Sequence, residues 1–289
     1  VRMYGHKHTK NEPREWLESL TWDGVPRISD FLTACFGAAP TEYTLKASRN
    51  FWIGIIARIC NPGCQLDNMI ILEGAQGIGK SRALRLLGGR WYAELSSTSI
   101  DTKEVGEILS GKIIIEISEL NAFSRAEVGA IKKLVSCPSD RYRNAYAGTA
   151  TDHPRACVFI GTTNEQEYLR DNTGARRFWP ITCGNIAYDL IERRRDQFFA
   201  EALQAYRAGE HWFMMPDTAA EEQELRRQSD EWEYIINSYL TLPNNLFLEH
   251  VTIAQIAKEC LKIEDSKLDK SIQMRIANVL RYLQWEKRA

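Results

Sequence analysis

The segment EGAQGIGKS at residues 73–81 constrains the fold of this chain more than any other feature. It follows the apolar run MIIL and precedes RALRLLGG, so we expect it to connect a buried strand to a helix. Its glycines let backbone N–H groups curl around a phosphate chain, and the N-terminus of the following helix adds partial positive charge. The segment matches the full Walker A pattern, Gly-x-x-x-x-Gly-Lys-Ser, which predicts a nucleotide site.

The Walker A match predicts that the chain binds ATP together with Mg²⁺. In this pattern the lysine reaches the β- and γ-phosphates and takes part in catalysis, and the serine hydroxyl holds the metal ion. A glycine-rich turn without a ligand is the alternative, but the expected strand before it and helix after it favour the nucleotide site. The residues predicted to bind the nucleotide are Gly74, Ala75, Gln76, Gly77, Ile78, Gly79, Lys80 and Ser81.

Two glutamates in the apolar segment IIIEISEL, residues 113–120, are candidates for the acids that hydrolysis needs. One acid binds Mg²⁺ and another orients the attacking water. In one register the strand ends at Ile115, Glu116 meets the metal and Glu119 lies alongside. In the other the strand runs to Ser118, and Glu119 at its tip polarises water. We favour the second register, with Glu119 as catalytic acid and Glu116 in a supporting role, and both remain candidate Mg²⁺ ligands.

Two further segments supply candidate catalytic side chains. VFIGTTN is an apolar strand pattern that ends at Asn164, where a neutral amide can hold the attacking water beside the γ-phosphate. This is the sensor position of additional-strand P-loop ATPases, and a polar strand cap is the alternative. The segment GARRFWP offers Arg176 or Arg177 as an arginine finger that reaches the γ-phosphate of a neighbouring subunit. A solvated or salt-bridged pair is the alternative for the two arginines.

The order of patterns along the chain predicts an α/β fold with a parallel sheet. Strand and helix patterns alternate from 66 to 215, which together with the Walker A segment we interpret as a P-loop ATPase core. Residues 1–65 read as a helical N-terminal extension, and residues 216–289 as a helical region that resembles a winged helix. Alternating aromatic and basic residues followed by Gly and Pro in DRYRNAYAGTATDHP predict a hairpin within the core.

Composition excludes several classes of protein. The 289 residues carry a net charge of −1, so the chain is no polycation and any DNA contact needs a local basic patch. Apolar stretches such as NFWIGIIARIC have about half the length of a membrane span, and the polar first residues show no signal peptide. Seven scattered cysteines indicate reduced thiols and a cytoplasmic location, and Cys60 and Cys64 lack the second ligand pair that zinc needs.

Four segments between residues 74 and 181 occur in an order that resembles a known family: the Walker A segment, IIIEISE, DRYRNAYAGTATDHPRACVFIGTTN and DNTGARRFWPI. The series is similar to superfamily 3 helicases of the AAA+ class, and more closely resembles the virulence-associated protein E family of phages, prophages and mobile islands. The resemblance implies a hexameric ring ATPase in the replication of mobile DNA, often behind a primase segment. The absence of such a segment and the first residue, Val1, suggest a fragment. Relatives often carry Asp where this chain has Ser118.

The resemblance also implies a hairpin that projects into the channel of the ring and contacts DNA. From Arg125 to Arg155 there are six Lys or Arg and three Asp or Glu residues, a net charge of +3. The candidates for phosphate contacts are Lys132, Lys133, Arg141 and Arg143, and Tyr142 or Tyr146 could stack on bases. The alternatives are a solvated helix face for the two lysines, and an ion pair with Asp140 or a contact with the neighbouring subunit for Arg141. Four basic residues of the tail are weaker candidates: Lys267, Lys270, Arg275 and Arg281.

Two hypotheses describe the activity. The first is an ATP-driven helicase or translocase that moves on single-stranded or forked DNA. The second is a nucleotide-switched DNA-binding adaptor that loads replication partners with little unwinding, and Ser118 in place of the expected acid keeps this alternative open. A small-molecule P-loop kinase is disfavoured, because the sensor asparagine and the paired arginines fit ring ATPases better.

Overall fold

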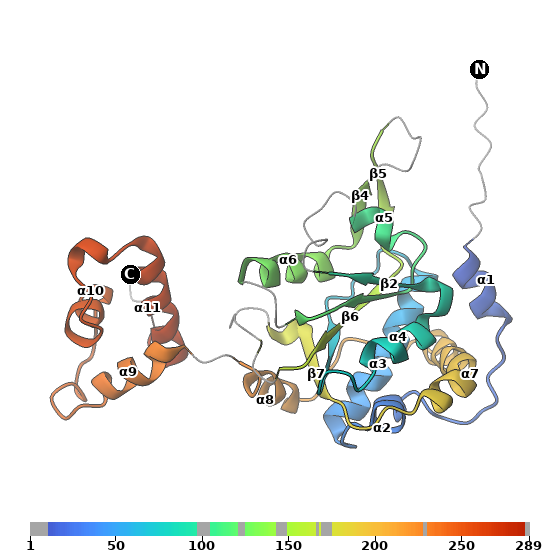
Figure 1. Ribbon diagram of the computed structural model, residues 1–289, viewed down its shortest axis with the longest axis horizontal. Helices are drawn as coiled ribbons and strands as arrows, with labels where there is room; N and C mark the ends of the chain where they lie inside the picture. The colour runs from blue at the N-terminus through green and yellow to red at the C-terminus, as the bar shows by residue number, and fades with distance from the viewer. Residues whose placement is uncertain are drawn as a thin grey trace. The chain divides into compact units, whose positions relative to one another are not determined.

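The computed structural model describes residues 11–96, 105–120, 125–142, 149–165, 168, 175–227 and 230–286 (Figure 1). The chain divides into two compact units, Val1–Arg227 and Gln228–Ala289. The domain borders predicted at residues 65 and 215 both fall inside the first unit. The reason is that the helices before 65 and after 215 share one hydrophobic core with the sheet, to which Leu17 and Ala219 both contribute.

The first unit is built on a five-stranded sheet in which every neighbouring pair is parallel, in the order β2-β3-β6-β1-β7. The strands are β1 (Met69–Glu73), β2 (Tyr92–Leu95), β3 (Ile114–Ile117), β6 (Val158–Thr163) and β7 (Phe178–Thr182). The three central strands β3, β6 and β1 are buried along their whole length, as expected for a parallel sheet that is covered on both faces. The predicted α/β fold with a parallel sheet is confirmed.

Helices cover both faces of this sheet (Figure 1). Side chains alternate along β1, so Ile70 and Leu72 enter one core and Met69 and Ile71 enter the other. The first core is covered by α1 (Glu12–Ser19), α2 (Phe31–Phe36), α3 (Glu42–Cys60), α4 (Lys80–Gly88) and α7 (Tyr188–Arg207), and α8 (Thr218–Glu224) adds Ala219 to it. The second core is covered by α5 (Val105–Leu109) and α6 (Arg125–Ser136).

Trp52 of α3 lies at the centre of the first core and is fully buried. Its ring contacts the rings of Phe31, Phe198 and Phe199 at centroid distances of 5.0, 5.3 and 5.0 Å. Phe31 belongs to α2 and the other two to α7, so one side chain joins three helices behind the sheet.

Replacing Trp52 by alanine is expected to lower the free energy of unfolding by about 3–5 kcal/mol, because a large cavity replaces the indole ring. Trp52→Phe is the control: it keeps an aromatic ring and removes an indole N–H that has no acceptor among the described residues. We therefore expect a clearly smaller loss for phenylalanine in urea denaturation followed by circular dichroism. Equal losses for the two variants would contradict this account of the core.

A second, two-stranded sheet extends from the first unit. Its strands β4 (Ser139–Tyr142) and β5 (Thr151–Pro154) are antiparallel, with Asp140 opposite His153. This pairing confirms the predicted hairpin, although residues 143–148 between the strands lie outside the described part of the chain. The rings of Tyr142 and His153 stack at 3.9 Å between centroids.

The second unit is helical across residues 230–286. Its elements are α9 (Glu231–Leu240), α10 (Ile253–Gln255), the π-helical turn η5 (Ile256–Cys260), η6 (Asp265–Lys267) and α11 (Lys270–Tyr282). Ile236, Ile256 and Ile276 are completely buried in its core. No strand occurs among residues 230–286, so the β-hairpin that a winged helix requires is not found there and the winged-helix prediction is not confirmed.

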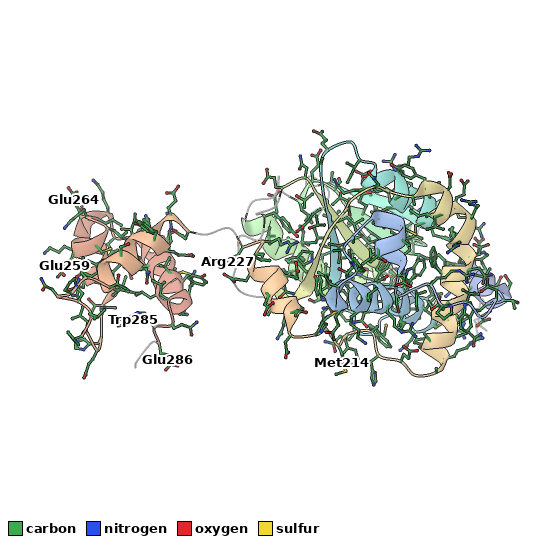
Figure 2. All side chains as sticks on the ribbon, turned by 90° about the horizontal axis from the view of Figure 1, so that it is seen from below. Met214, Arg227, Glu259, Glu264, Trp285 and Glu286 are labelled. Carbon is green, nitrogen blue, oxygen red and sulfur yellow. The ribbon has the colours of Figure 1, made fainter. Side chains whose placement is uncertain are left out.

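The surface of both units carries long side chains of mixed charge and polarity (Figure 2). Met214 of the first unit is 60% exposed, and Glu259 of the second accepts a hydrogen bond from the hydroxyl of Tyr239 at 2.6 Å.

No helix in the described part of the chain combines the length and the apolar character that a membrane span requires.

Candidate functional site

The Walker A segment occupies the junction between β1 and α4. Gly74, Gly77 and Gly79 have φ values of 150°, 85° and 92°, in the region that side chains disfavour. A Cβ at Gly79 would lie 1.6 Å from the hydroxyl oxygen of Tyr188, so only glycine fits there. Gly79 is also the N-cap of α4, and without a side chain it leaves the first N–H groups of the helix available to another acceptor.

Lys80 is the first residue of α4 and folds back over the loop that precedes it. Its Nζ donates hydrogen bonds to the carbonyl oxygens of Gly74 at 2.6 Å and Ala75 at 3.1 Å. Burial lowers the pKa of Lys80, and the neighbouring Cys183 and Glu116 act in the opposite direction. The ammonium group is thus held at the first turn of the glycine-rich segment.

Glu116 of β3 is completely buried and accepts hydrogen bonds from three hydroxyl groups. Ser81 donates to Oε1 at 2.6 Å, Thr162 of β6 donates to Oε1 at 2.8 Å, and Tyr92 donates to Oε2 at 2.6 Å. Burial, followed by the hydrogen bond and the charge of Glu116, raises the pKa of Tyr92. The carboxylate is therefore fixed against the serine of the Walker A segment, on the face of the sheet that α4 covers.

The structure agrees with the favoured register of the acidic strand to within one residue. β3 ends at Ile117, which places Glu116 inside the strand and brings it to Ser81. Glu119 lies two residues beyond the strand, is exposed and has a φ of 53°. Ser118 uses its N–H to continue the sheet by donating to the carbonyl of Leu95 at 3.3 Å. Pairing with the neighbouring strand thus extends to Ser118, and Glu119 follows directly. The catalytic role of Glu119 stays a prediction.

Asn164 lies at the same edge of the sheet as the Walker A segment. It is exposed and follows Thr163, the last residue of β6. The parallel register pairs Thr163 with Glu73, the last residue of β1, so Asn164 and Gly74 are the next residues along two adjacent strands. The sensor role of Asn164 stays a prediction.

Arg176 and Arg177 lie at the opposite edge of the sheet, in η4 (Ala175–Arg177) before β7. The register pairs Phe178 with Met69, the first residue of β1, whereas the Walker A segment follows the last one. The five residues of β1, about 16 Å of strand, therefore separate these arginines from the Walker A segment of the same chain.

The two arginines differ in their surroundings. Arg177 Nε donates to Ser136 Oγ at 2.8 Å, whereas Arg176 is exposed. Both line a cavity of about 430 Å³ whose wall also includes Asp67 and Asp217. Arg176 is therefore the better placed of the pair to reach beyond its own chain.

The predicted DNA contacts differ in their surroundings. Lys133 of α6 and Arg141 of β4 are exposed, and Arg141 pairs with Asp152 at 3.7 Å and not with Asp140. Lys132 is 7% exposed, because it faces the sheet with its Nζ 5.8 Å from the centre of the Phe178 ring. A buried lysine cannot contact a DNA phosphate, so the prediction that Lys132 binds DNA is wrong.

Other DNA candidates are outside the described part or engaged elsewhere. Arg143 and Tyr146 lie outside the described residues. Arg275 of the tail forms an ion pair with Asp230 at 2.8 Å, and its guanidinium lies 3.9 Å from the centre of the Trp232 ring. Arg275 therefore has a structural role within the second unit.

Comparison with known proteins identifies the family. Residues 17–232 match the virulence-associated protein E-like domain, which covers more than half of the chain and all of the site described above. The chain belongs to the virulence-associated protein E-like family.

Solved structures resemble this virulence-associated protein E-like chain in fold. The apo structure of the NrS-1 C-terminal region, residues 305–718, has a TM-score of 0.54 and 17% sequence identity, with 94% of this chain and 70% of that chain covered. The A form of the same region gives 0.53 and 16%, covering 94% and 69%. No curated protein matches the sequence.

The virulence-associated protein E-like domain also contains site residues that the sequence did not reveal. Tyr188, at the start of α7, donates its hydroxyl to the carbonyl of Ile78 at 3.0 Å, and the guanidinium of Arg82 lies 4.4 Å from the centre of its ring. Tyr188 thereby fixes the glycine-rich segment from a helix more than a hundred residues away. Nothing in the sequence around Tyr188 indicated this contact.

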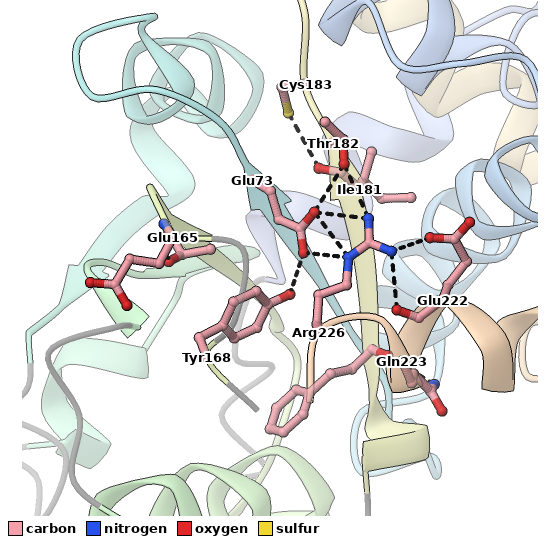
Figure 3. Close-up of polar contacts among 11 residues, drawn as sticks. Glu73, Glu165, Tyr168, Ile181, Thr182, Cys183, Glu222, Gln223 and Arg226 are labelled. Carbon is pink, nitrogen blue, oxygen red and sulfur yellow. Dashed lines mark hydrogen bonds and ion pairs between the residues drawn. The ribbon is translucent and has the colours of Figure 1, made fainter. Parts of the chain in front are cut away.

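A second network surrounds Glu73, the residue before Gly74 (Figure 3). Glu73 ends β1, is buried, and binds Arg226, Tyr168 and Thr182. A carboxylate at the end of an otherwise apolar strand was a visible signal that a partner was needed. The partner itself, 153 residues away, was not predictable from the sequence.

Proposed function

We propose that this chain is the ATPase part of a DNA motor that acts in the replication of phage or mobile genetic elements. ATP and Mg²⁺ bind at residues 74–81, and hydrolysis drives movement along single-stranded or forked DNA. The observation that carries the proposal is the 2.6 Å hydrogen bond between Ser81 Oγ and the buried carboxylate of Glu116. A hydroxyl and a carboxylate paired at this edge of the sheet supply the oxygen ligands that Mg²⁺ prefers.

The order of the strands supports a P-loop ATPase of the AAA+ class. β6 is inserted between β1, which leads into the Walker A segment, and β3, which carries Glu116. An additional strand at this position brings its own terminal residue, Asn164, to the edge where the phosphate chain would bind. The alternation of helices on both faces agrees with this class, and ligands of such folds bind at the carboxyl ends of the strands.

Each side chain of the site has a distinct task in this proposal. The backbone N–H groups of the Walker A segment and the first turn of α4 donate to phosphate oxygens, and Lys80 exchanges the carbonyls of Gly74 and Ala75 for phosphate. Ser81 and Glu116 would hold Mg²⁺, which neutralises charge on the phosphates when bound. Asn164 positions the attacking water, and Glu119 accepts its proton.

The position of Arg176 supports a ring of several copies. Because the length of β1 separates Arg176 from the Walker A segment of its own chain, an arginine finger from this position can serve only a neighbouring copy. Closed rings arise when each copy uses two different faces, here the edge that carries Arg176 and the edge that carries the nucleotide. We propose a hexamer as the active form.

Replacing Arg176 by alanine is expected to lower ATP hydrolysis by about a thousandfold and to leave nucleotide binding nearly unchanged. The reason is that the guanidinium acts on charge that develops in the transition state of the neighbouring site. Arg193→Ala is the matched control, since Arg193 is an exposed arginine on α7. ATP turnover and binding of a fluorescent ATP analogue measure the two effects.

Mixing two inactive variants distinguishes a neighbour from the same chain. Arg176→Ala copies retain Lys80, and Lys80→Ala copies retain Arg176, so mixed rings contain interfaces with both residues intact. Partial recovery of hydrolysis on mixing supports action between copies. No recovery at any ratio would contradict it.

The hairpin of β4 and β5 is the element that we propose contacts DNA. Arg141 is exposed on β4 of this hairpin, and Lys133 is exposed on α6, which precedes it in the chain. Phosphate contacts by such residues make affinity fall with salt concentration.

The proposed function is tested by measuring ATP hydrolysis with and without single-stranded DNA, and strand separation on a forked duplex. Oligomer mass is determined on the same preparation with an ATP analogue and DNA present. Stimulation by DNA together with unwinding is expected. ATP hydrolysis that is stimulated by DNA without unwinding would favour an adaptor that loads replication partners. Absence of ATP hydrolysis under every condition would overturn the proposed enzymatic activity.

A further inference from the structure

Glu73 places a buried negative charge directly next to the Walker A segment. It is the last residue of β1 and is bonded to Gly74, and it is 3% exposed. Its carboxylate accepts hydrogen bonds from Tyr168 at 2.8 Å and from Thr182 at 3.0 Å (Figure 3). These neutral donors satisfy the oxygen atoms but leave the charge of the group uncompensated.

Arg226 supplies the compensating charge. Its Nε lies 2.9 Å from Glu73 Oε1 and its Nη2 lies 3.0 Å from Oε2, a two-pronged ion pair of the kind that arginine favours. The Nη1 atom of Arg226 donates to the carbonyl oxygen and to the carboxylate of Glu222. These bonds fix the orientation of the guanidinium. Burial alone would lower the pKa of Arg226, but Glu73 and Glu222 together raise it above its usual value.

Because Glu73 and Arg226 lie next to residues 74–81, their charges affect the affinity of this segment for an anion. A charge in a buried site is poorly screened by water and acts over more than one residue of chain. Glu73 without its partner would repel a triphosphate at the adjacent loop, and the repulsion would grow with the charge of the ligand. With Arg226 in place, its charge offsets that of the buried Glu73, whereas its second partner, Glu222, is 31% exposed and better screened by water. The attraction from Lys80 then prevails.

We propose that Arg226 is a positioning residue of the nucleotide site, which permits triphosphate binding by neutralising Glu73. The inference rests on the proposed nucleotide binding at residues 74–81. It assigns a role to a residue just after α8 at the end of the first unit, 153 residues from its partner and just before Arg227 (Figure 2). A purely structural ion pair would instead affect stability and leave discrimination between nucleotides untouched.

The test compares the binding of a non-hydrolysable ATP analogue, ADP and AMP to the full chain without Mg²⁺. Arg226→Met is expected to weaken binding of the ATP analogue by about tenfold or more, with a smaller loss for ADP and the smallest for AMP. Arg49→Met is the control, because Arg49 forms a two-pronged ion pair with Glu210 at 2.8 and 2.6 Å that is more exposed than the pair of Arg226 with Glu73. Arg49→Met should change the affinities for the ATP analogue, ADP and AMP only slightly and by the same factor.

Two further variants keep the proposal falsifiable if Arg226→Met does not fold. Glu73→Gln removes the negative charge and is expected to bind the ATP analogue at least as tightly as the wild type. The double variant, Glu73→Gln with Arg226→Met, removes both charges and is expected to recover affinity to within about threefold of the wild type, since neutral replacements of a buried pair are tolerated. Recovery in the double variant supports charge compensation.

The outcomes separate the two levels of the proposal. If the wild type binds nucleotide and Arg226→Met binds all three ligands as tightly, or loses the same factor for each, the role of Arg226 is overturned. Weaker binding by Glu73→Gln, or no recovery in the double variant, also overturns it. If the wild type binds none of the three ligands, the proposed function itself fails.

Discussion

Replacing Lys80 by alanine is expected to lower ATP hydrolysis by at least about a hundredfold, since it removes a preorganised donor from the position of the β- and γ-phosphates. In the structure Lys80 Nζ lies 2.6 Å from the carbonyl of Gly74, within the curl of the glycine-rich segment. The ammonium therefore needs only a small movement to contact a phosphate oxygen at the same place. Steady-state ATP turnover and binding of a fluorescent ATP analogue measure the effect.

Lys112→Ala is the control for this substitution. Lys112 donates its Nζ to the carbonyl of Arg90 at 3.0 Å and lies at the other end of β3 from Glu116. The control should hydrolyse ATP at the wild-type rate and unfold at a similar temperature. A Lys80→Ala variant that turns over ATP as fast as the wild type would show that the nucleotide site is misassigned.

The second large effect is expected when the two glutamates are replaced separately. Glu116→Gln should lower hydrolysis by about 10²–10³-fold and raise the Mg²⁺ concentration needed for half-maximal activity, because the charge beside Ser81 is lost. Glutamine keeps the shape of the side chain, and the hydroxyls of Tyr92 and Thr162 can rotate to suit the amide. Titration of ATP turnover with Mg²⁺ gives both quantities.

Glu119→Gln is the paired comparison and should behave differently. Glu119 is exposed and two residues beyond β3, so its loss is expected to lower the maximal rate without changing the Mg²⁺ requirement. If Glu119→Gln changes the Mg²⁺ requirement and Glu116→Gln does not, the two roles are reversed. If neither variant slows hydrolysis, both residues lie outside the reaction.

Much of the fold was predictable because its signals are local. The central strands are short apolar runs, and the glycines of the Walker A segment mark the point where β1 meets α4. The hairpin of β4 and β5 was signalled by alternating residues and by the Gly and Pro that follow. Periodicity and turn chemistry act over a few neighbouring residues, so one sequence suffices to read them.

The less predictable parts depend on contacts between distant segments. The surroundings of Glu116 were not predictable, because an apolar strand tolerates a buried glutamate only when donors such as Ser81, Tyr92 and Thr162 surround it. The burial of Lys132 depends on which face of α6 meets the sheet. Neither the donors around Glu116 nor the packing of α6 is encoded in a local pattern.

The separation of Arg176 from the Walker A segment has a genetic consequence. If each arginine serves the adjoining copy, then a chain with a faulty Arg176 damages a reaction that its normal neighbour performs. When variant and normal chains are expressed together, each variant chain would inactivate the nucleotide site of a normal neighbour. The loss of ATP hydrolysis would therefore be dominant. One strand of five residues, by its length alone, would make this protein unable to work in isolation.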